Sequence, residues 1–288
     1  MAGSDSAPTS SQISGAPAAD WCAPDYGPIP GGGCLAIDAT APGAQQLVVY
    51  LHGRYARTAA GEELSRQQRL AKRAMKRGFA VLALRGRLGA CTAPELADWY
   101  CWPSNEHNAA SADEIVASWA DTLAAAAVRS RSPKRFLLGF SNGGYFAGLI
   151  ASRGLLGADA VVVAHGGPVE PVHAANARPP LLLLSADDDV AQDEMIRYDR
   201  ELAREGWSHD SYARSGGHAL SDEDIDTALT FFSRAGEPLP LVPPLPLHRP
   251  VFHVRDAGES LAVESGSELP DEPLDSDDTP AEISDDDY

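Results

Sequence analysis

Residues 136–151 contain the sequence feature that most limits how this chain can fold. A short apolar run ends at Phe140, Ser141 and a glycine-rich turn follow, and apolar residues then recur at helical spacing. This order predicts a strand, a very tight turn and a helix, with the serine in the turn. Gly139 and Gly143 flank the serine at the G-x-S-x-G spacing of a nucleophile elbow. The glycines leave room where the strand and helix backbones nearly touch, so we expect the hydroxyl to stand above the sheet edge.

Apolar runs of strand length alternate with amphipathic segments of helical length over most of the chain. This alternation predicts an α/β fold, with a mostly parallel sheet and helices on both faces. We expect strands at 34–38 (an edge strand), 47–51, 79–84, 135–140, 160–164, 181–184 and 209–214. We expect helices at 62–77, 111–129, 143–153, 191–205 and 221–234, the second opening with a capping box at 111–114.

Residues 85–108 are expected to form a long, irregular loop that is rich in aromatic residues. Loops at the carboxyl ends of strands line the site in open α/β sheets, so this loop is a candidate wall of a cleft. The alternative is that its tryptophans only fill a small core of the loop itself.

The negative charge of the chain is concentrated at its carboxyl end. The formal net charge is −18, and residues 255–288 hold 13 Asp and Glu against one Arg, which is −12 of that total. We expect a disordered leader at 1–20, a folded domain at 21–235, and a Pro-rich and then acidic disordered tail at 236–288. A solvated tail is expected rather than one that binds calcium or a basic partner. No basic patch predicts nucleic-acid binding, and no apolar stretch has the ~18 to 20 residues of a membrane span.

Four cysteines occur as two close pairs, Cys22 with Cys34 and Cys91 with Cys101. Four cysteines allow three pairings, of which local pairing is the simplest. The segment between the first pair is rich in proline and glycine, which predicts a loop without regular structure. Two disulfides would favour an extracytoplasmic or secreted protein. Because residues 1–20 show no signal-peptide pattern, a cytoplasmic protein with four thiols is the alternative.

A serine hydroxyl needs two partners to act as a nucleophile at neutral pH. An imidazole must take its proton, and a carboxylate must orient the imidazole. His218 follows Gly216 and Gly217 in a loop before the last expected helix, and we expect it to be the base. His165 is the rival, but it precedes the candidate acids, whereas the expected order is serine, acid, histidine.

Three adjacent acids follow the strand expected at 181–184. Counting from the start of the strand favours Asp189, whereas counting back from the next helix favours Asp187, and Asp188 lies between them. We expect Asp189 to be the orienting acid, with Asp187 or Asp188 as the alternative. Positions counted along a strand are more reliable here, because the strand is the more rigid of the two elements. Adjacent side chains diverge, so the three acids do not predict a calcium site.

Several segments together resemble one superfamily. The α/β-hydrolases of the carboxylesterase, dienelactone hydrolase and phospholipase-like group have landmarks that match residues 50–53, 139–144, 181–189 and 216–218. The similar region extends from about residue 47 to residue 234. It departs from the usual pattern at Ser185 and Ala186, where the loop of the acid usually begins with glycine.

This resemblance implies an α/β-hydrolase fold and a set of roles. It implies Ser141 as nucleophile, His218 as base and Asp189 as the acid that orients the base. It also implies that the backbone amides of Asn142 and Arg54 form the oxyanion hole. The residues themselves leave Tyr55 open as the alternative to Arg54, because either amide lies in the loop after His52 and Gly53. No metal and no organic cofactor is implied.

The expected activity is that of a serine hydrolase that cleaves small carboxylic esters through an acyl-enzyme intermediate. One alternative is a serine peptidase, because residues 139–144 also resemble the elbow of prolyl oligopeptidase-like enzymes, although their propeller domain has no counterpart here. A second alternative is a non-catalytic binding protein of the same fold. The sequence does not give the oligomeric state.

Overall fold

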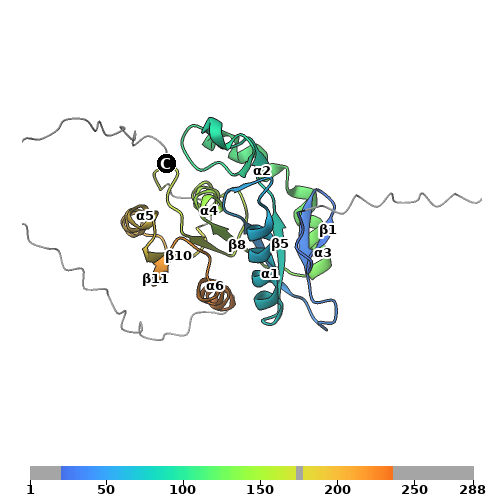
Figure 1. The fold of residues 1–288 in the computed structure, drawn as a ribbon. Coiled ribbons are helices and arrows are strands. Elements are labelled where there is room, and N and C mark those ends of the chain that lie inside the picture. Colours follow the sequence, from blue (N-terminus) through green and yellow to red (C-terminus); the bar gives the residue numbers. More distant parts are fainter. Residues whose placement is uncertain (1–20, 173–177, 236–288) are drawn as a thin grey trace, which may run out of the picture. The chain divides into compact units, whose positions relative to one another are not determined.

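The computed structural model describes residues 21–172 and 178–235, which build one large sheet covered by helices (Figure 1). The strand order is β1-β2-β5-β3-β8-β9-β10-β11, in which β1–β2 and β2–β5 are antiparallel and the other neighbours are parallel. The predicted mostly parallel α/β sheet is therefore confirmed. Its strands are β1 (Gly27–Ile29), β2 (Gly33–Ala36), β3 (Gln46–Leu51), β5 (Phe79–Leu84), β8 (Arg135–Phe140), β9 (Ala160–Ala164), β10 (Leu181–Asp188) and β11 (His209–Gly217). The predicted leader and tail lie outside the described residues.

Helices pack on both faces of this sheet. They are α1 (Gly61–Met75), α2 (Ala112–Ala117), α3 (Ala120–Ser130), α4 (Asn142–Arg153), α5 (Gln192–Arg204) and α6 (Asp222–Arg234). One buried cluster joins the sheet to α1 and α6, and a second joins it to α2, α3, α4 and α5. Successive side chains of a strand point to opposite faces, so in β3 Val48 and Tyr50 belong to the first cluster, and Val49 and Leu51 to the second.

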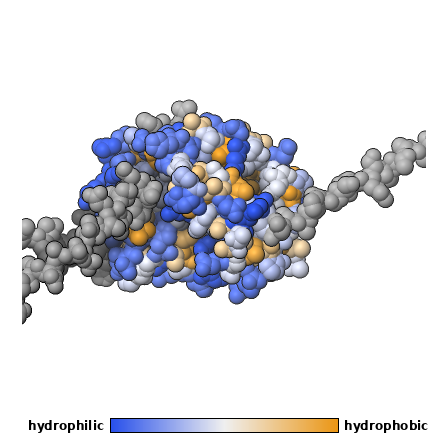
Figure 2. Space-filling model, turned by 45° about the horizontal axis from the view of Figure 1, so that its top comes forward, coloured by the Kyte–Doolittle hydropathy of each residue, from blue (hydrophilic) through white to orange (hydrophobic). Residues whose placement is uncertain are grey.

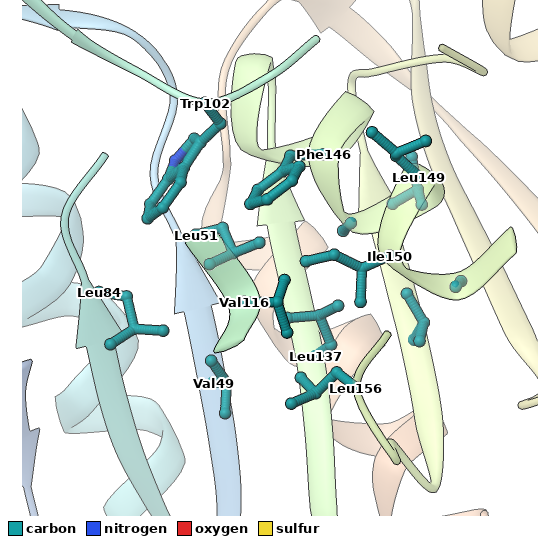
Figure 3. Close-up of a cluster of buried hydrophobic side chains, with 14 of the residues drawn as sticks. Val49, Leu51, Leu84, Trp102, Val116, Leu137, Phe146, Leu149, Ile150 and Leu156 are labelled. Carbon is teal, nitrogen blue, oxygen red and sulfur yellow. The ribbon is translucent and has the colours of Figure 1, made fainter. Parts of the chain in front are cut away.

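Trp102 belongs to the second cluster, although it comes from the loop predicted at 85–108. Figure 3 shows its ring facing Phe146 of α4, and the two rings stack with their centroids 5.5 Å apart. Trp119 meets both rings edge-on. The tryptophan is therefore part of the domain core on one face of the sheet, which neither interpretation of the loop anticipated.

The same loop also contributes to a second, small antiparallel sheet. Its strands are β4 (Tyr55–Ala56), β6 (Arg87–Leu88) and β7 (Trp99–Cys101), in the order β4-β7-β6, with the 3-10 turn η1 (Pro94–Leu96) between β6 and β7. Cys91 pairs with Cys101 across this segment, and Cys22 pairs with Cys34, with Cα atoms 5.4 and 5.5 Å apart respectively. These are the local pairs that the sequence favours.

The region between the first two cysteines is not the irregular loop that its composition predicts. Strand β1 forms there and pairs antiparallel with β2, with Pro28 opposite Cys34. The strand lies at the sheet edge, where a proline costs no ladder hydrogen bond. The edge strand is thus β1, and the strand expected at 34–38 is the second strand of the sheet.

The helix expected at 111–129 is broken, and its predicted capping box is absent. The 3-10 turn η2 (Ala109–Ser111) precedes α2, and Ser111 donates to the carbonyl oxygen of Asn108 instead of capping the helix. The break falls at Ser118 and Trp119, where the tryptophan ring turns into the core. In contrast, a capping box that the sequence analysis did not predict forms at Ser221, with Asp224 as its partner.

The surface shown in Figure 2 is largely hydrophilic, with small hydrophobic areas among polar and charged residues. Within residues 21–172 and 178–235, none of the helices combines the length and the apolar character needed to cross a bilayer.

Candidate active site

Ser141 lies in the tight turn between β8 and α4. Its backbone has φ 53° and ψ −123°, an unusual conformation for a residue other than glycine. A Cβ at Gly139 would overlap the carbonyl oxygen of Gly143, and a Cβ at Gly143 would overlap the carbonyl oxygen of Leu51. The two glycines are therefore required by the close approach of strand and helix. The amide of Ser141 donates to the carbonyl oxygen of Ala164, which ties the turn to β9.

His218 lies between the serine and a carboxylate. Its Nε2 atom is 2.7 Å from Ser141 Oγ, and its Nδ1 atom is 2.7 Å from Asp189 Oδ1. A neutral imidazole with hydrogen on Nδ1 would donate to the carboxylate and accept from the hydroxyl. The structure thus brings together the three side chains that the sequence predicts. Asp189 is buried, whereas the side chain of His218 is 31% exposed.

The two alternative acids are turned elsewhere. Asp187 accepts a hydrogen bond from the amide of Gly216 at 2.8 Å, and Asp188 is exposed at the end of β10. Asp189 is the first residue after that strand, and its Oδ1 atom also accepts from the amide of Ala191 at 2.8 Å. Of the three adjacent acids, only Asp189 contacts His218 in the described part of the chain.

The loop after β3 runs beside the serine. A Cβ built at Gly53 would lie 3.2 Å from the Cβ of Ser141, so the neighbouring residue, Arg54, is close to the turn. Asn142 is the first residue of α4, and its amide has no acceptor within the helix. The two predicted oxyanion-hole residues therefore lie on segments that flank Ser141.

His52 fixes the loop that leads to Arg54. Its Nδ1 atom lies 2.6 Å from the carbonyl oxygen of Gly53, and its Nε2 atom accepts from the amide of Gly86 at 2.8 Å. Burial lowers the pKa of His52 to about 3, so the ring is neutral and donates through Nδ1. Trp102 Nε1 donates to the carbonyl oxygen of His52, which adds a third tie. This histidine holds the loop in place and does not face the serine hydroxyl.

Two buried residues next to the site have contacts that the sequence did not predict. They are His165, which the sequence offers only as a rival base, and Asp224, to which it gives no role in the site. His165 Nδ1 contacts Asp189 Oδ2, and its Nε2 atom lies 3.3 Å from Asp224 Oδ2. Both residues are fully buried. The sequence presents His165 as a rival base, but the structure places it behind the carboxylate of Asp189. The local signal that pointed to it is its position directly before Gly166 and Gly167, at the end of the apolar strand at 160–164.

Hydrogen bonds control the charge of Asp189. Burial works to raise the pKa of this carboxyl, but hydrogen bonds from His165, His218 and the amide of Ala191 outweigh it and hold the pKa well below its usual range. The carboxylate is therefore ionised at neutral pH and can stabilise a positive charge on His218.

A metal ion could be considered at the same place on distance alone. Ligand atoms of His165, Asp189 and His218 lie within 4.8 Å of one another. Each of the three side chains already takes part in the hydrogen bonds described above, and the Nε2 atom of His218 faces Ser141. We therefore assign this group to hydrogen bonding rather than to metal binding.

A family model described as the dienelactone hydrolase family matches residues 56–223 of this chain. The chain belongs to the dienelactone hydrolase family. The matched region contains Ser141, Asp189 and His218, and Arg54 lies two residues before it. Membership supports hydrolase activity and confirms the resemblance that the sequence motifs indicate. No curated protein sequence matches the chain.

Solved structures share the fold at low sequence identity. Esterase PE8 has a TM-score of 0.53 and 21% identity over 70% of this chain and 97% of its own. YahD, solved with malic acid, has a TM-score of 0.52 and 18% identity over 70% of this chain and 98% of its own. SOBER1 of Arabidopsis thaliana has a TM-score of 0.55 and 16% identity over 67% of this chain and 100% of its own. At these identities the likeness establishes the α/β-hydrolase fold of this family member.

Proposed function

We propose that this chain is a serine hydrolase that cleaves small carboxylic esters through an acyl-enzyme intermediate. The observation that carries the proposal is the unbroken line of hydrogen bonds from Ser141 Oγ through His218 to Asp189. A serine at the tip of a strand-to-helix turn, an imidazole on its oxygen and an ionised carboxylate behind it are the parts that acyl transfer requires. Membership of the dienelactone hydrolase family supports the same class of reaction.

In the first half-reaction, Ser141 Oγ attacks the carbonyl carbon of the ester while its proton passes to His218 Nε2. The negative charge that develops on the carbonyl oxygen is stabilised by the amides of Asn142 and Arg54. His218 then gives the proton to the departing alkoxide oxygen, so that an alcohol leaves and an acyl-serine remains. Asp189 stabilises the positive charge that the imidazole carries between these steps.

In the second half-reaction, water takes the place of the serine hydroxyl. His218 accepts a proton from the water as its oxygen attacks the acyl carbon, and then returns a proton to Ser141 Oγ. The products are a carboxylic acid and the free enzyme. The partial exposure of His218 supports this step, because solvent can reach the base.

Turnover of short p-nitrophenyl esters tests this proposal. Ser141→Ala, His218→Ala and Asp189→Asn should each lower kcat/KM at least about 10³-fold, because the three groups act as one unit. Asp188→Asn is the matched control, since it removes a neighbouring carboxylate that is exposed, and it should retain the activity of the original chain. Equal losses in both Asp variants would contradict the assignment of Asp189.

The same assay separates the alternatives. Matched p-nitroanilides and short peptides should be turned over far more slowly than the esters. Efficient amide cleavage would favour the serine peptidase, and a folded chain without any turnover would favour a binding protein.

A further inference from the structure

Asp189 is shared between two histidines. Its Oδ1 atom faces His218, and its Oδ2 atom faces His165. The rings of the two histidines are 5.8 Å apart and nearly perpendicular. Only one of the two imidazoles can reach Ser141, so the second must act on the carboxylate.

The backbone around His165 is hydrogen-bonded both to the turn of Ser141 and to β10. The residue follows the last residue of β9 in a left-handed conformation, with φ 54°. Its amide donates to the carbonyl oxygen of Leu184 in β10, and the carbonyl oxygen of Ala164 accepts from the amide of Ser141. The left-handed turn is unusual for a residue other than glycine, and it persists where the surroundings fix it. His165 is thus held rigidly between the turn that carries the serine and the strand that carries the acid.

The far side of His165 meets a second buried carboxylate. Asp224 Oδ2 lies 3.3 Å from His165 Nε2 and accepts from Arg214 Nε at 2.9 Å. The same oxygen accepts from the backbone amide and the hydroxyl of Ser221, which begins α6. Asp224 therefore belongs to the capping box of the last helix, and through His165 that helix is joined to Asp189.

The hydrogen-bond pattern determines the charge of His165. Both of its ring nitrogens face carboxylate oxygens, which only accept hydrogen bonds, so both nitrogens need a hydrogen. Burial works to lower the pKa of His165, but the hydrogen bonds to Asp189 and Asp224 outweigh it and raise the pKa. With an imidazolium at His165 and the guanidinium of Arg214, the two buried carboxylates are balanced. His218 can then remain neutral and accept a proton.

We propose that His165 is a positioning residue that, as a buried imidazolium, holds Asp189 in place and balances its charge so that His218 stays a neutral base. This inference rests on the proposed function. A neutral His165 would leave one uncompensated negative charge beside His218 and would favour the protonated, inactive form of that ring. His165 acts on the reaction only through Asp189.

Titratable and charged side chains surround His165 on several elements, and Arg66 of α1 lies over the ring of Phe140, which packs against both histidines. The others are Asp189 after β10, Arg214 in β11, His218 after β11, Asp224 in α6, Tyr145 in α4 and Glu194 in α5, which accepts a hydrogen bond from Tyr145 at 2.6 Å. Tyr145 and Glu194 are unchanged in the variants below.

The pH dependence of serine labelling tests the inference. The second-order rate of labelling by a fluorophosphonate should fall at acid pH in the original chain. In His165→Gln, which retains one donor but no charge, the midpoint of this fall should move to higher pH by about one unit or more, because a positive charge near His218 is lost. Val162→Ala is the matched control, since it removes buried apolar contacts from β9, the strand directly before His165, and should lower stability without moving the midpoint.

Nitrogen NMR of the unaltered protein gives a second measurement that does not depend on activity or on a variant that folds. Both ring nitrogens of His165 should be protonated between about pH 6 and 8, where a free imidazole loses its proton. A single protonated nitrogen, or a folded His165→Gln chain with the original midpoint, would overturn the inference. If the original chain is not labelled at all, the proposed function fails, whereas the NMR result still decides the charge of His165.

Discussion

Asn142 holds the main chain of Trp102 by two hydrogen bonds. Its Oδ1 atom accepts from the amide of Trp102 at 2.7 Å, and its Nδ2 atom donates to the carbonyl oxygen of the same residue at 3.2 Å. The side chain of the residue after the serine thus holds the loop that fills the core beneath α4. Its backbone amide is a separate group, for which we propose a role in the oxyanion hole.

Asn142→Ala should therefore lower the free energy of unfolding by about 2 to 3 kcal/mol, because the buried amide and carbonyl of Trp102 lose their partners. Urea denaturation measures this loss. The control is Ser152→Ala in the same helix, where the lost hydrogen bond goes to the carbonyl oxygen of Leu149 within α4, and about 1 kcal/mol is expected. Equal losses in the two variants would show that the contact with Trp102 contributes little.

Gly143→Ala should prevent the elbow from closing. The added Cβ would overlap the carbonyl oxygens of Leu51 and His52, which belong to the backbone and cannot turn aside. We expect a loss of at least about 3 kcal/mol in the free energy of unfolding, seen as a lower Tm. Gly157→Ala is the matched control, because a Cβ there meets no atom within 4 Å, and its effect should stay within about 0.5 kcal/mol. A fully stable Gly143→Ala chain would contradict the described turn.

His52 should make the free energy of unfolding depend on pH below neutrality. Because burial lowers its pKa to about 3 in the folded chain, the unfolded chain binds an extra proton between that value and the usual pKa of about 6.5. Stability should thus fall as pH is lowered through this range, by up to about 1.4 kcal/mol per pH unit from this residue. His52→Gln should be less stable at neutral pH but show a shallower slope in urea denaturation at several pH values.

The exposed His107 provides the control for this slope, since His107→Gln removes a histidine that is not buried. It should leave the dependence of stability on pH unchanged. If His52→Gln and the original chain lose stability in parallel below pH ~6, another group causes the loss.

The two cysteine pairs predict a mass difference. Full reduction of the unfolded chain should add about 4 Da, because each disulfide takes up two hydrogens. An unchanged mass would mean four thiols and would remove the argument for an oxidising compartment. That compartment is our proposal, and it depends on these two bonds.

The elements that the sequence predicts well are those whose signal is local. The strands around Val49, Leu82, Leu137 and Val162 are runs of apolar residues buried on both faces, and each formed where its run predicts. The helix expected at 221–234 also formed, with Ser221 as its N-terminal cap. The capping box expected at Ser111 did not form because Ser111 lies in the 3-10 turn η2 with a helical backbone, and its hydroxyl donates to the carbonyl oxygen of Asn108.

The parts that the sequence does not reveal depend on contacts between distant residues. Strand β1 exists because it pairs with β2, although its own composition is that of a loop. His165 and Asp224 are 59 residues apart, and nothing in either local pattern indicates that they meet behind Asp189. The expected triad could be chosen because the order and spacing of Ser141, Asp189 and His218 follow a known superfamily, whereas the groups that support it follow no such pattern.

The most direct test of the central claim is covalent labelling by a fluorophosphonate, followed by intact mass and peptide mapping. Our account predicts about one label per chain, located on Ser141, and no label on a folded Ser141→Ala chain. A folded chain that is not labelled, or one labelled equally after Ser141→Ala, would contradict the account and leave the hydrolase fold without an activated serine.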